Sequence, residues 1–181
     1  MANKEALRAL QQRLAERLQT VRQHAPERKW LAVDISGHGF LLPLEQAGEI
    51  FPLSPIQTLP HSQPWFLGVA NLRGHLHGVV DTGVFFGLSA RPARLQADFA
   101  TKDTGGRLIA LNASLQINVA LLVDRLLGLR SASTLTPADR ASAEGRPHFI
   151  TETMVDGDGR CWYEIDLAAL SADEAFLKID A

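Results

Sequence analysis

Hydrophobic and polar positions change their period along the chain, and this change separates a helical segment from a β-rich remainder. Between residues 4 and 24, apolar residues recur at intervals of three and four, and polar and charged residues fill the gaps. The apolar residues are Leu7, Leu10, Leu14, Leu18 and Val21. Their spacing predicts an amphipathic helix that ends before Pro26. The pattern leaves open whether this helix packs on its own domain, binds a partner or associates with a second copy.

Beyond Pro26, short apolar runs separated by turn-forming residues continue to about residue 165. The predicted strands are 30–35, 40–44, 74–80, 99–101, 108–113, 116–122, 150–155 and 161–165. Turn signals between them include Ser36-Gly37-His38-Gly39 and Asp156-Gly157-Asp158-Gly159. This pattern predicts an all-β barrel or sandwich, followed by a short helix over residues 167–177.

Two stretches of the β-rich part resemble each other in kind. Each has a Val- and Leu-rich strand that ends in an aspartate, first Val79-Val80-Asp81 and later Leu122-Val123-Asp124. They suggest two small β subdomains joined by the Pro- and Arg-containing segment 90–96. We therefore expect an N-terminal helix within residues 1–27 and one domain of two subdomains over residues 28–181.

Composition narrows the classes of function. The chain of 181 residues is 46% hydrophobic and has a net charge of −2, so it offers no basic field for nucleic acid or anionic lipid. No apolar run approaches the roughly 20 residues of a membrane helix, and the charged N-terminus lacks a signal-peptide pattern. These features predict a soluble, cytoplasmic protein. Cys161, the single cysteine, cannot form an intrachain disulfide, and we expect it in the core.

Candidate catalytic and metal-binding motifs are weak. The chain has no phosphate-binding glycine loop and no nucleophile elbow. His75 and His77 point the same way on a strand, and His61 is a third candidate zinc ligand, but no Cys or acidic motif at metal spacing accompanies them. The turn at residues 156–159 resembles the start of a calcium loop, yet Leu167 stands where that loop needs a glutamate. We predict no enzyme activity, metal or cofactor.

The central segment resembles the signature of the CheW-like family, the adaptor domains of bacterial chemosensory arrays. The matching pieces, in order, are Glu49-Ile50, Pro60, Gly68-Val69-Ala70-Asn71-Leu72-Arg73-Gly74, Val79-Val80-Asp81, Phe86-Gly87-Leu88 and residues 120–129. The resemblance covers roughly residues 28–170. The stretch Pro64-Trp65-Phe66-Leu67 and the N-terminal helical extension are similar to PilI-type adaptors of type IV pilus (twitching motility) systems, whereas a flagellar chemotaxis adaptor is the alternative.

This resemblance implies a fold and a role. The family fold is two small five-stranded SH3-like β-barrels packed together. Its members are non-catalytic scaffolds that couple the cytoplasmic helical tip of a chemoreceptor to a histidine autokinase by docking on the kinase regulatory domain. We therefore expect a protein of membrane-associated receptor arrays that does not insert in the membrane or bind nucleic acid. Its oligomeric state stays open.

The resemblance also implies partner-binding residues. Arg73 is expected near Glu49, either to present a fixed guanidinium to a partner or only to join two strands. The other residues expected at or near the interfaces are Gly68, Asn71 and Gly74. For both glycines, a bulge or a barrel corner is the structural alternative. A groove between the barrels is expected to bind the receptor tip, with Val119 and Leu121 as candidate lining residues and an ordinary core position as the alternative.

Two departures from the family pattern lie downstream of Arg73. His77-Gly78 replaces a common apolar-Pro pair, and Thr82-Gly83 replaces a common Leu-Arg pair. We expect both to lie beside the interface, where they affect the choice of partner more than the fold. Two other functions stay open on the sequence alone. One is a metalloprotein that uses the three histidines, and the other is a small barrel that binds single-stranded nucleic acid.

Overall fold

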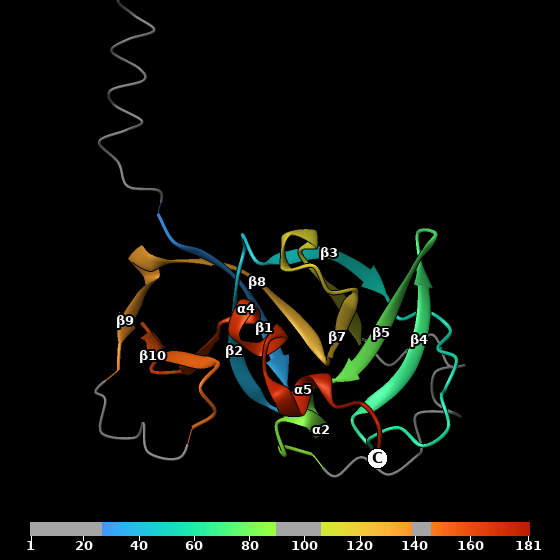
Figure 1. Ribbon diagram of the computed structural model, residues 1–181. Helices are drawn as coiled ribbons and strands as arrows, with labels where there is room; N and C mark the ends of the chain where they lie inside the picture. Colours follow the sequence, from blue (N-terminus) through green and yellow to red (C-terminus); the bar gives the residue numbers. More distant parts are fainter. Residues whose placement is uncertain (1–26, 90–105, 139–145) are drawn as a thin grey trace, which may run out of the picture.

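The computed structural model describes residues 27–89, 106–138 and 146–181, which form two β-sheets packed against each other with short helices at their edges (Figure 1). The predicted helix 4–24, the predicted strand 99–101 and the segment 90–96 lie outside these residues. The all-β prediction is confirmed, because strands make up 52% of the structure and the helices are few and short.

The first sheet has six strands in the order β8-β1-β2-β11-β10-β9. Their bounds are Arg125–Ser131 (β8), Lys29–Ile35 (β1), His38–Pro43 (β2), Cys161–Ile165 (β11), Ile150–Asp156 (β10) and Leu135–Pro137 (β9). Every neighbouring pair is antiparallel except β2 and β11, which run parallel. The predicted turn at residues 156–159 connects β10 and β11 as a hairpin.

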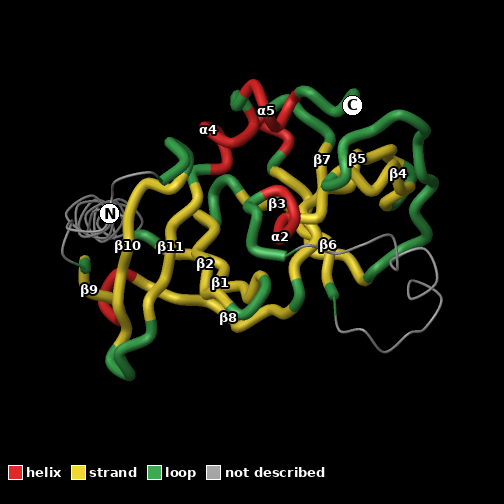
Figure 2. The backbone as a smooth tube through the Cα atoms, turned by 90° about the horizontal axis from the view of Figure 1, so that it is seen from below, coloured by secondary structure: helices red, strands yellow, loops and turns green. Residues whose placement is uncertain are grey.

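The second sheet has five strands in the order β3-β6-β7-β5-β4. Their bounds are Ala47–Pro52 (β3), Arg107–Leu111 (β6), Val119–Val123 (β7), His75–Asp81 (β5) and Phe66–Leu72 (β4). The helices are α2 (Thr82–Phe85), α4 (Leu167–Ser171) and α5 (Glu174–Leu177), and the 3₁₀ turns are η1 (Ala113–Leu115) and η2 (Ala132–Thr134). Figure 2 shows α4 and α5 side by side at the margin where the two sheets meet. The single helix predicted over 167–177 is thus two short helices, each beginning after an aspartate N-cap.

The two sheets do not follow each other along the chain, contrary to the prediction. The second sheet uses residues 47–123 without interruption, whereas the first combines β1 and β2 with strands that begin only at residue 125. Residues 90–96 therefore connect two strands of the same sheet, β5 and β6, and do not join two subdomains. The β7–β8 connection at Asp124 is where the chain returns from the second sheet to the first.

Buried apolar side chains of the described residues form three clusters, because several central strands are covered on both faces. We call the barrels formed by the first and second sheets the first and second barrel. On β1, Trp30 and Ala32 point into the first barrel, whereas Leu31, Val33 and Ile35 point toward the second sheet. On β7, Ala120 and Leu122 fill the second barrel, whereas the alternate residues face the first sheet. A strand buried on both faces reads as a continuous apolar run, which explains the sequence pattern of these strands.

Candidate partner-binding surface

The hairpin that joins β4 and β5 presents Arg73 at its tip. Leu72 pairs with His75, so Arg73 and Gly74 are the two residues of the turn. Their φ angles are +51° and +86°, as in a type I′ hairpin turn. The amide of Gly74 donates to Oδ1 of Asn71 over 2.8 Å, and this bond braces the turn. Arg73 therefore lies on a tight turn at the tip of the hairpin.

Arg73 forms the expected ion pair with Glu49 of β3, from its Nη1 to Oε1 of the carboxylate. The guanidinium carbon also lies 5.9 Å from the centre of the Phe51 ring, which in turn packs against His77. The side chain of Arg73 is 74% exposed and that of Glu49 is 43% exposed. An exposed pair of this kind adds only about 0–1 kcal/mol to stability. Its main physical effect is to hold a charged group in place at the surface.

Gly68 lies at the point where the second sheet closes on itself. The segment after β3 returns to β4 through a bridge in which Gln57 and Val69 exchange two backbone hydrogen bonds of 2.8 Å. Gly68 has a φ of +130°, and a Cβ atom there would lie 2.1 Å from the carbonyl oxygen of Gln57. The register of β4 and β5 shifts between Phe66 and Gly68, which confirms a bulge. Gly68 is itself buried, so no side chain at this position reaches a partner without disturbing the closure.

The structure places Val119 and Leu121 in the core between the two sheets, and this corrects the expectation that they line an open groove. Val119 is 9% exposed and Leu121 is fully buried. Both belong to the cluster that includes Leu31, Val33 and Ile35 of β1. The alternative interpretation, an ordinary core position, is right for both residues.

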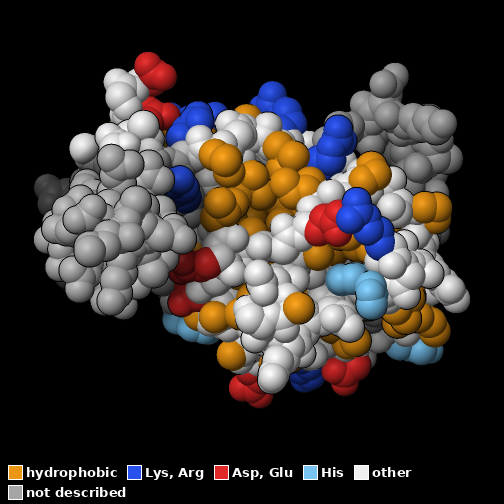
Figure 3. All heavy atoms as spheres, turned by 90° about the horizontal axis from the view of Figure 1, so that it is seen from above, with side chains coloured by type: hydrophobic (Ala, Val, Ile, Leu, Met, Phe, Trp, Pro, Cys, Tyr) orange, Lys and Arg blue, Asp and Glu red, His pale blue; other side chains and the backbone are white. Residues whose placement is uncertain are grey.

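Other apolar side chains of the described residues are exposed as well. Leu126 and Leu129 of β8 are 36% and 60% exposed, and Leu44 after β2 is 41% exposed. Leu129 and Leu126 pair with Leu31 and Val33, so all four side chains point to the face between the sheets. We call Leu44, Leu126 and Leu129 the β8 face. Figure 3 shows one face of the molecule, on which apolar side chains lie next to acidic, basic and histidine side chains.

Only one of the two departures from the family pattern lies near Arg73. His77 packs against Phe51, which lies beneath the Arg73 guanidinium. Thr82 and Gly83 are buried at the start of α2, at the opposite end of β5. Seven strand residues separate the two ends by about 23 Å. Thr82 and Gly83 are therefore buried and far from Arg73, whereas His77 lies close to it.

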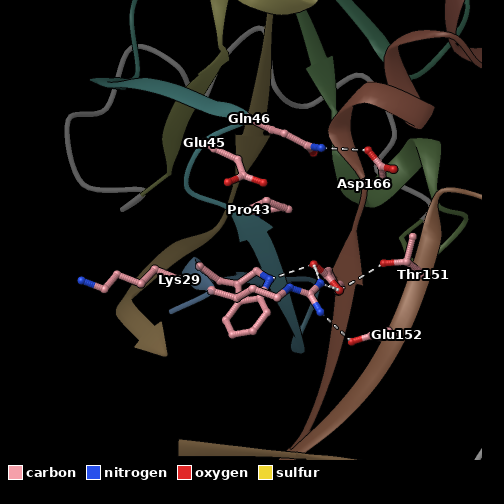
Figure 4. Close-up of a pocket in the computed structure, with 10 residues that line it drawn as sticks. Lys29, Pro43, Glu45, Gln46, Thr151, Glu152 and Asp166 are labelled. Atoms are coloured by element: carbon pink, nitrogen blue, oxygen red, sulfur yellow. Dashed lines mark hydrogen bonds and ion pairs between the residues drawn. The ribbon is translucent and has the colours of Figure 1, made fainter. Parts of the chain in front are cut away.

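A polar cavity of about 210 Å³ lies between β1, β10 and β11 and was not predicted (Figure 4). Glu164 is buried at its base and accepts hydrogen bonds from Arg28 at 2.6 and 2.8 Å, from Trp30 at 2.9 Å and from Thr151 at 3.2 Å. Burial lowers the pKa of Arg28, but hydrogen bonds and charge from Glu164 outweigh it and raise the pKa above its ordinary value. Because these polar groups satisfy one another, the network fastens the start of β1 to β11.

Among the described residues, no group of three or more His, Cys, Asp or Glu side chains is placed to hold a metal ion. Cys161 is exposed at the start of β11, so the expectation of a core cysteine is wrong. Its position follows from strand alternation, since the next residue, Trp162, fills the first barrel. No helix within these ranges is long and apolar enough to cross a membrane.

Comparisons with known proteins agree with this geometry. The CheW-like domain family matches residues 29–175. Protein PilI of Pseudomonas aeruginosa is 28% identical over 96 residues, which is 53% of this chain and 48% of PilI. The chain thus matches about half the length of that curated relative. The crystal structure of the scaffolding protein TtCheW from Thermoanaerobacter tengcongensis superposes with a TM-score of 0.62 at 19% identity, over 80% of this chain and 87% of that one.

The structural likeness to TtCheW supports the fold, two sheets in the arrangement of SH3-like barrels. The family match extends over most of the chain and includes both barrels and the hairpin that carries Arg73. The ion pair between Arg73 and Glu49 and the closure at Gly68 both lie inside the matched range. The protein belongs to the CheW-like domain family, the scaffold proteins of chemosensory systems.

Proposed function

We propose that this protein is a non-catalytic cytoplasmic adaptor that couples a chemoreceptor to a histidine kinase in a chemosensory array that controls type IV pili. The family match supports the adaptor role, and the likeness to PilI favours a pilus system over a flagellar one. In this proposal, the surface around Arg73 contacts the regulatory domain of the kinase, and the β8 face contributes to the groove for the receptor tip. The single observation that carries the proposal is the exposed, fixed Arg73.

The contacts of Arg73 suit recognition by another protein. Its guanidinium has one acidic partner and one aromatic neighbour, yet three quarters of the side chain stays in solvent. A planar guanidinium group held in this way can still donate hydrogen bonds to a carboxylate or a carbonyl of a partner. Leu76 on β5 and Ile50 on β3 are also exposed, at 62% and 39%. An arginine that packs over an aromatic ring is a combination typical of interface hot spots.

The β8 face suits a different kind of partner. Its leucines come from β8 and from the chain after β2, and they flank the buried core between the barrels. An amphipathic helix binds such a surface with residues at intervals of three and four. The cytoplasmic tip of a chemoreceptor is helical, and we assign the β8 face to it in place of Val119 and Leu121.

The test measures binding of the purified chain to the regulatory domain of its kinase. We expect Arg73→Glu to weaken binding at least tenfold while leaving the unfolding midpoint nearly unchanged. Lys178→Glu, the same charge change on an exposed residue near the C-terminus, is the matched control and should bind like wild type.

A charge swap separates partner contact from strand joining. The double variant Glu49→Arg with Arg73→Glu restores the ion pair with opposite polarity. If the pair only joins β3 to the hairpin, the double variant binds like wild type, and the proposed contact of Arg73 with the kinase is refuted. If the partner reads Arg73 directly, binding stays weak. Wild-type protein that fails to bind any kinase regulatory domain of a pilus system would refute the adaptor proposal itself.

A further inference from the structure

The β8 face is an apolar surface on an edge strand. β8 hydrogen-bonds only to β1, so one of its sides has no neighbouring strand among the described residues. Among the large apolar side chains of the described residues, only that of Leu76 is more exposed than that of Leu129. Exposed apolar patches rimmed by polar residues are typical of interaction sites. We therefore expect a segment of this chain or a partner protein to cover the β8 face.

The chain enters the fold beside this face. The carboxylate of Glu27 accepts from the amide of Ser133 over 3.3 Å, and the carbonyl of Arg28 accepts from the amide of Ala132 over 3.1 Å. Lys29 pairs with Ser131, two residues from Leu129, and its carbonyl accepts from the amide of Leu44 over 3.0 Å. Residues 1–26 are consequently tethered next to both Leu44 and Leu129.

The tethered segment has the composition that this face requires. Its stripe of Leu7, Leu10, Leu14, Leu18 and Val21 is the amphipathic pattern described above. Leu14 and Leu18 would lie about 6 Å apart along a helix. Leu126 and Leu129 lie about 7 Å apart, because they pair with Val33 and Leu31, two residues apart on β1. The segment also holds five basic and two acidic side chains, whereas residues 27–181 hold 13 basic and 18 acidic ones. Charge therefore favours association of the segment with its own domain.

Length allows the contact. Two residues separate the predicted end of the helix at residue 24 from Glu27, and they span at most about 10 Å. A helix of 21 residues is about 31 Å long. The ends of β8 lie about 17 Å apart, because Ser131 and Arg125 pair with Lys29 and Asp34 of β1. A helix that runs back along β8 from its Ser131 end would thus cover the strand completely.

We propose that residues 4–24 dock through this stripe on the β8 face of the same molecule and compete there with a partner helix. The competition rests on the proposed function, whereas the docking does not. A tether this short gives an effective concentration in the millimolar range, so a weak contact is enough to keep the face covered. If the face is covered nine-tenths of the time, a competing helix binds about tenfold more weakly than it would to an open face.

The direct test is hydrogen–deuterium exchange of the full-length chain. In Leu14→Glu with Leu18→Glu, the stripe loses its apolar character, and we expect exchange over residues 4–24 and 125–131 to become several-fold faster than in wild type. Gln12→Glu with Gln19→Glu adds the same charge on the opposite side of the predicted helix and should leave exchange unchanged. Equal exchange over residues 125–131 in all three proteins would overturn the docking. Protection that increases with protein concentration would also overturn it, because the segment would then dock on a second copy.

A second measurement separates docking from the adaptor role. Affinity for a peptide of the receptor tip should rise about tenfold in Leu14→Glu with Leu18→Glu and stay at the wild-type value in the control. Receptor binding that is equal in all three proteins refutes the competition but leaves the adaptor role intact. A change in exchange without any receptor binding refutes the adaptor role but leaves the docking intact.

Discussion

Replacement of Gly68 by alanine provides a quantitative test of how the second barrel closes. The new Cβ atom would lie 2.1 Å from the carbonyl oxygen and 2.7 Å from the carbonyl carbon of Gln57, and 2.8 Å from the Cα atom of Thr58. All three neighbours are backbone atoms, so a rotamer change cannot relieve the contact. The bridge between Gln57 and Val69 has to open, or the strand has to change its φ angle.

The expected cost combines two effects. A φ of +130° is strained for any residue with a side chain, by about 1–3 kcal/mol. Loss of the two backbone hydrogen bonds between Gln57 and Val69 adds about 0.5–1.5 kcal/mol each. We therefore expect Gly68→Ala to lower the free energy of unfolding by about 2–6 kcal/mol, a large share of the about 5–15 kcal/mol typical of a domain.

Urea unfolding monitored by tryptophan fluorescence measures this cost. Two control variants divide it into its parts. Gly74→Ala has a φ of +86° but no atom within 4 Å of the new Cβ, so it should cost only about 1–2 kcal/mol. Gly157→Ala has neither a positive φ nor a close neighbour and should change stability by less than about 0.5 kcal/mol. Equal costs at Gly68 and Gly74 would refute the argument, because contact with Gln57 would then contribute nothing.

Three further predictions concern the first barrel. Glu164→Gln removes the buried charge that Arg28 contacts. It should lower the free energy of unfolding by about 1–3 kcal/mol in the same assay. An unchanged midpoint would contradict the role of Glu164 in joining β1 to β11. Cys161 should react with a thiol reagent in the native protein as fast as a free thiol, and labelling only after unfolding would contradict its exposed position. Hydrogen bonds from the Trp162 indole and the Arg160 amide lower the pKa of Asp156 in the folded protein. The ionised Asp156 carboxylate therefore stabilises the fold fully above its ordinary pKa of 3.8, and this stabilisation is lost as pH falls through the lower pKa of the folded state. Asp156→Asn should accordingly weaken the acid-side dependence of the unfolding midpoint, and an identical pH profile would contradict this.

Strand alternation and turn residues predicted much of the fold. The runs at 30–35, 150–155 and 161–165 are strands because their residues face apolar cores on at least one side. β8 was missed because a bulge interrupts its alternation at Leu127, between the pairings of Leu126 and Gly128 with β1. Gln116 to Asn118 were predicted as strand, but Gln116 has a φ of +56° and ends a 3₁₀ turn. Backbone irregularities of this kind leave little trace in hydrophobic period.

The candidate site was predicted in part. Resemblance to the family placed Glu49 beside Arg73, and the ion pair confirms it. Phe51 and His77 were missed as neighbours of Arg73, because their contacts depend on how β3 and β5 curve toward each other in space. The burial of Leu121 could not be read from one apolar residue, since interior and interface strands have the same composition. The pairing of β2 with β11 could not be predicted either, because no local sequence pattern identifies a partner strand more than 100 residues away.

The order of strands in the two sheets has a consequence for synthesis on the ribosome. Every strand of the second sheet has been made once residue 123 has emerged, so that barrel can close early. β1 and β2 emerge first of all, yet their partners β8 and β11 are the products of the second half of the chain. One face of the oldest hairpin can pack on the second sheet at that stage, but Trp30, Ala32 and Leu41 on its other face stay in water until residues 125–165 arrive. We expect nascent chains that stall between residues 123 and 165 to be the species most prone to aggregate and most dependent on chaperones.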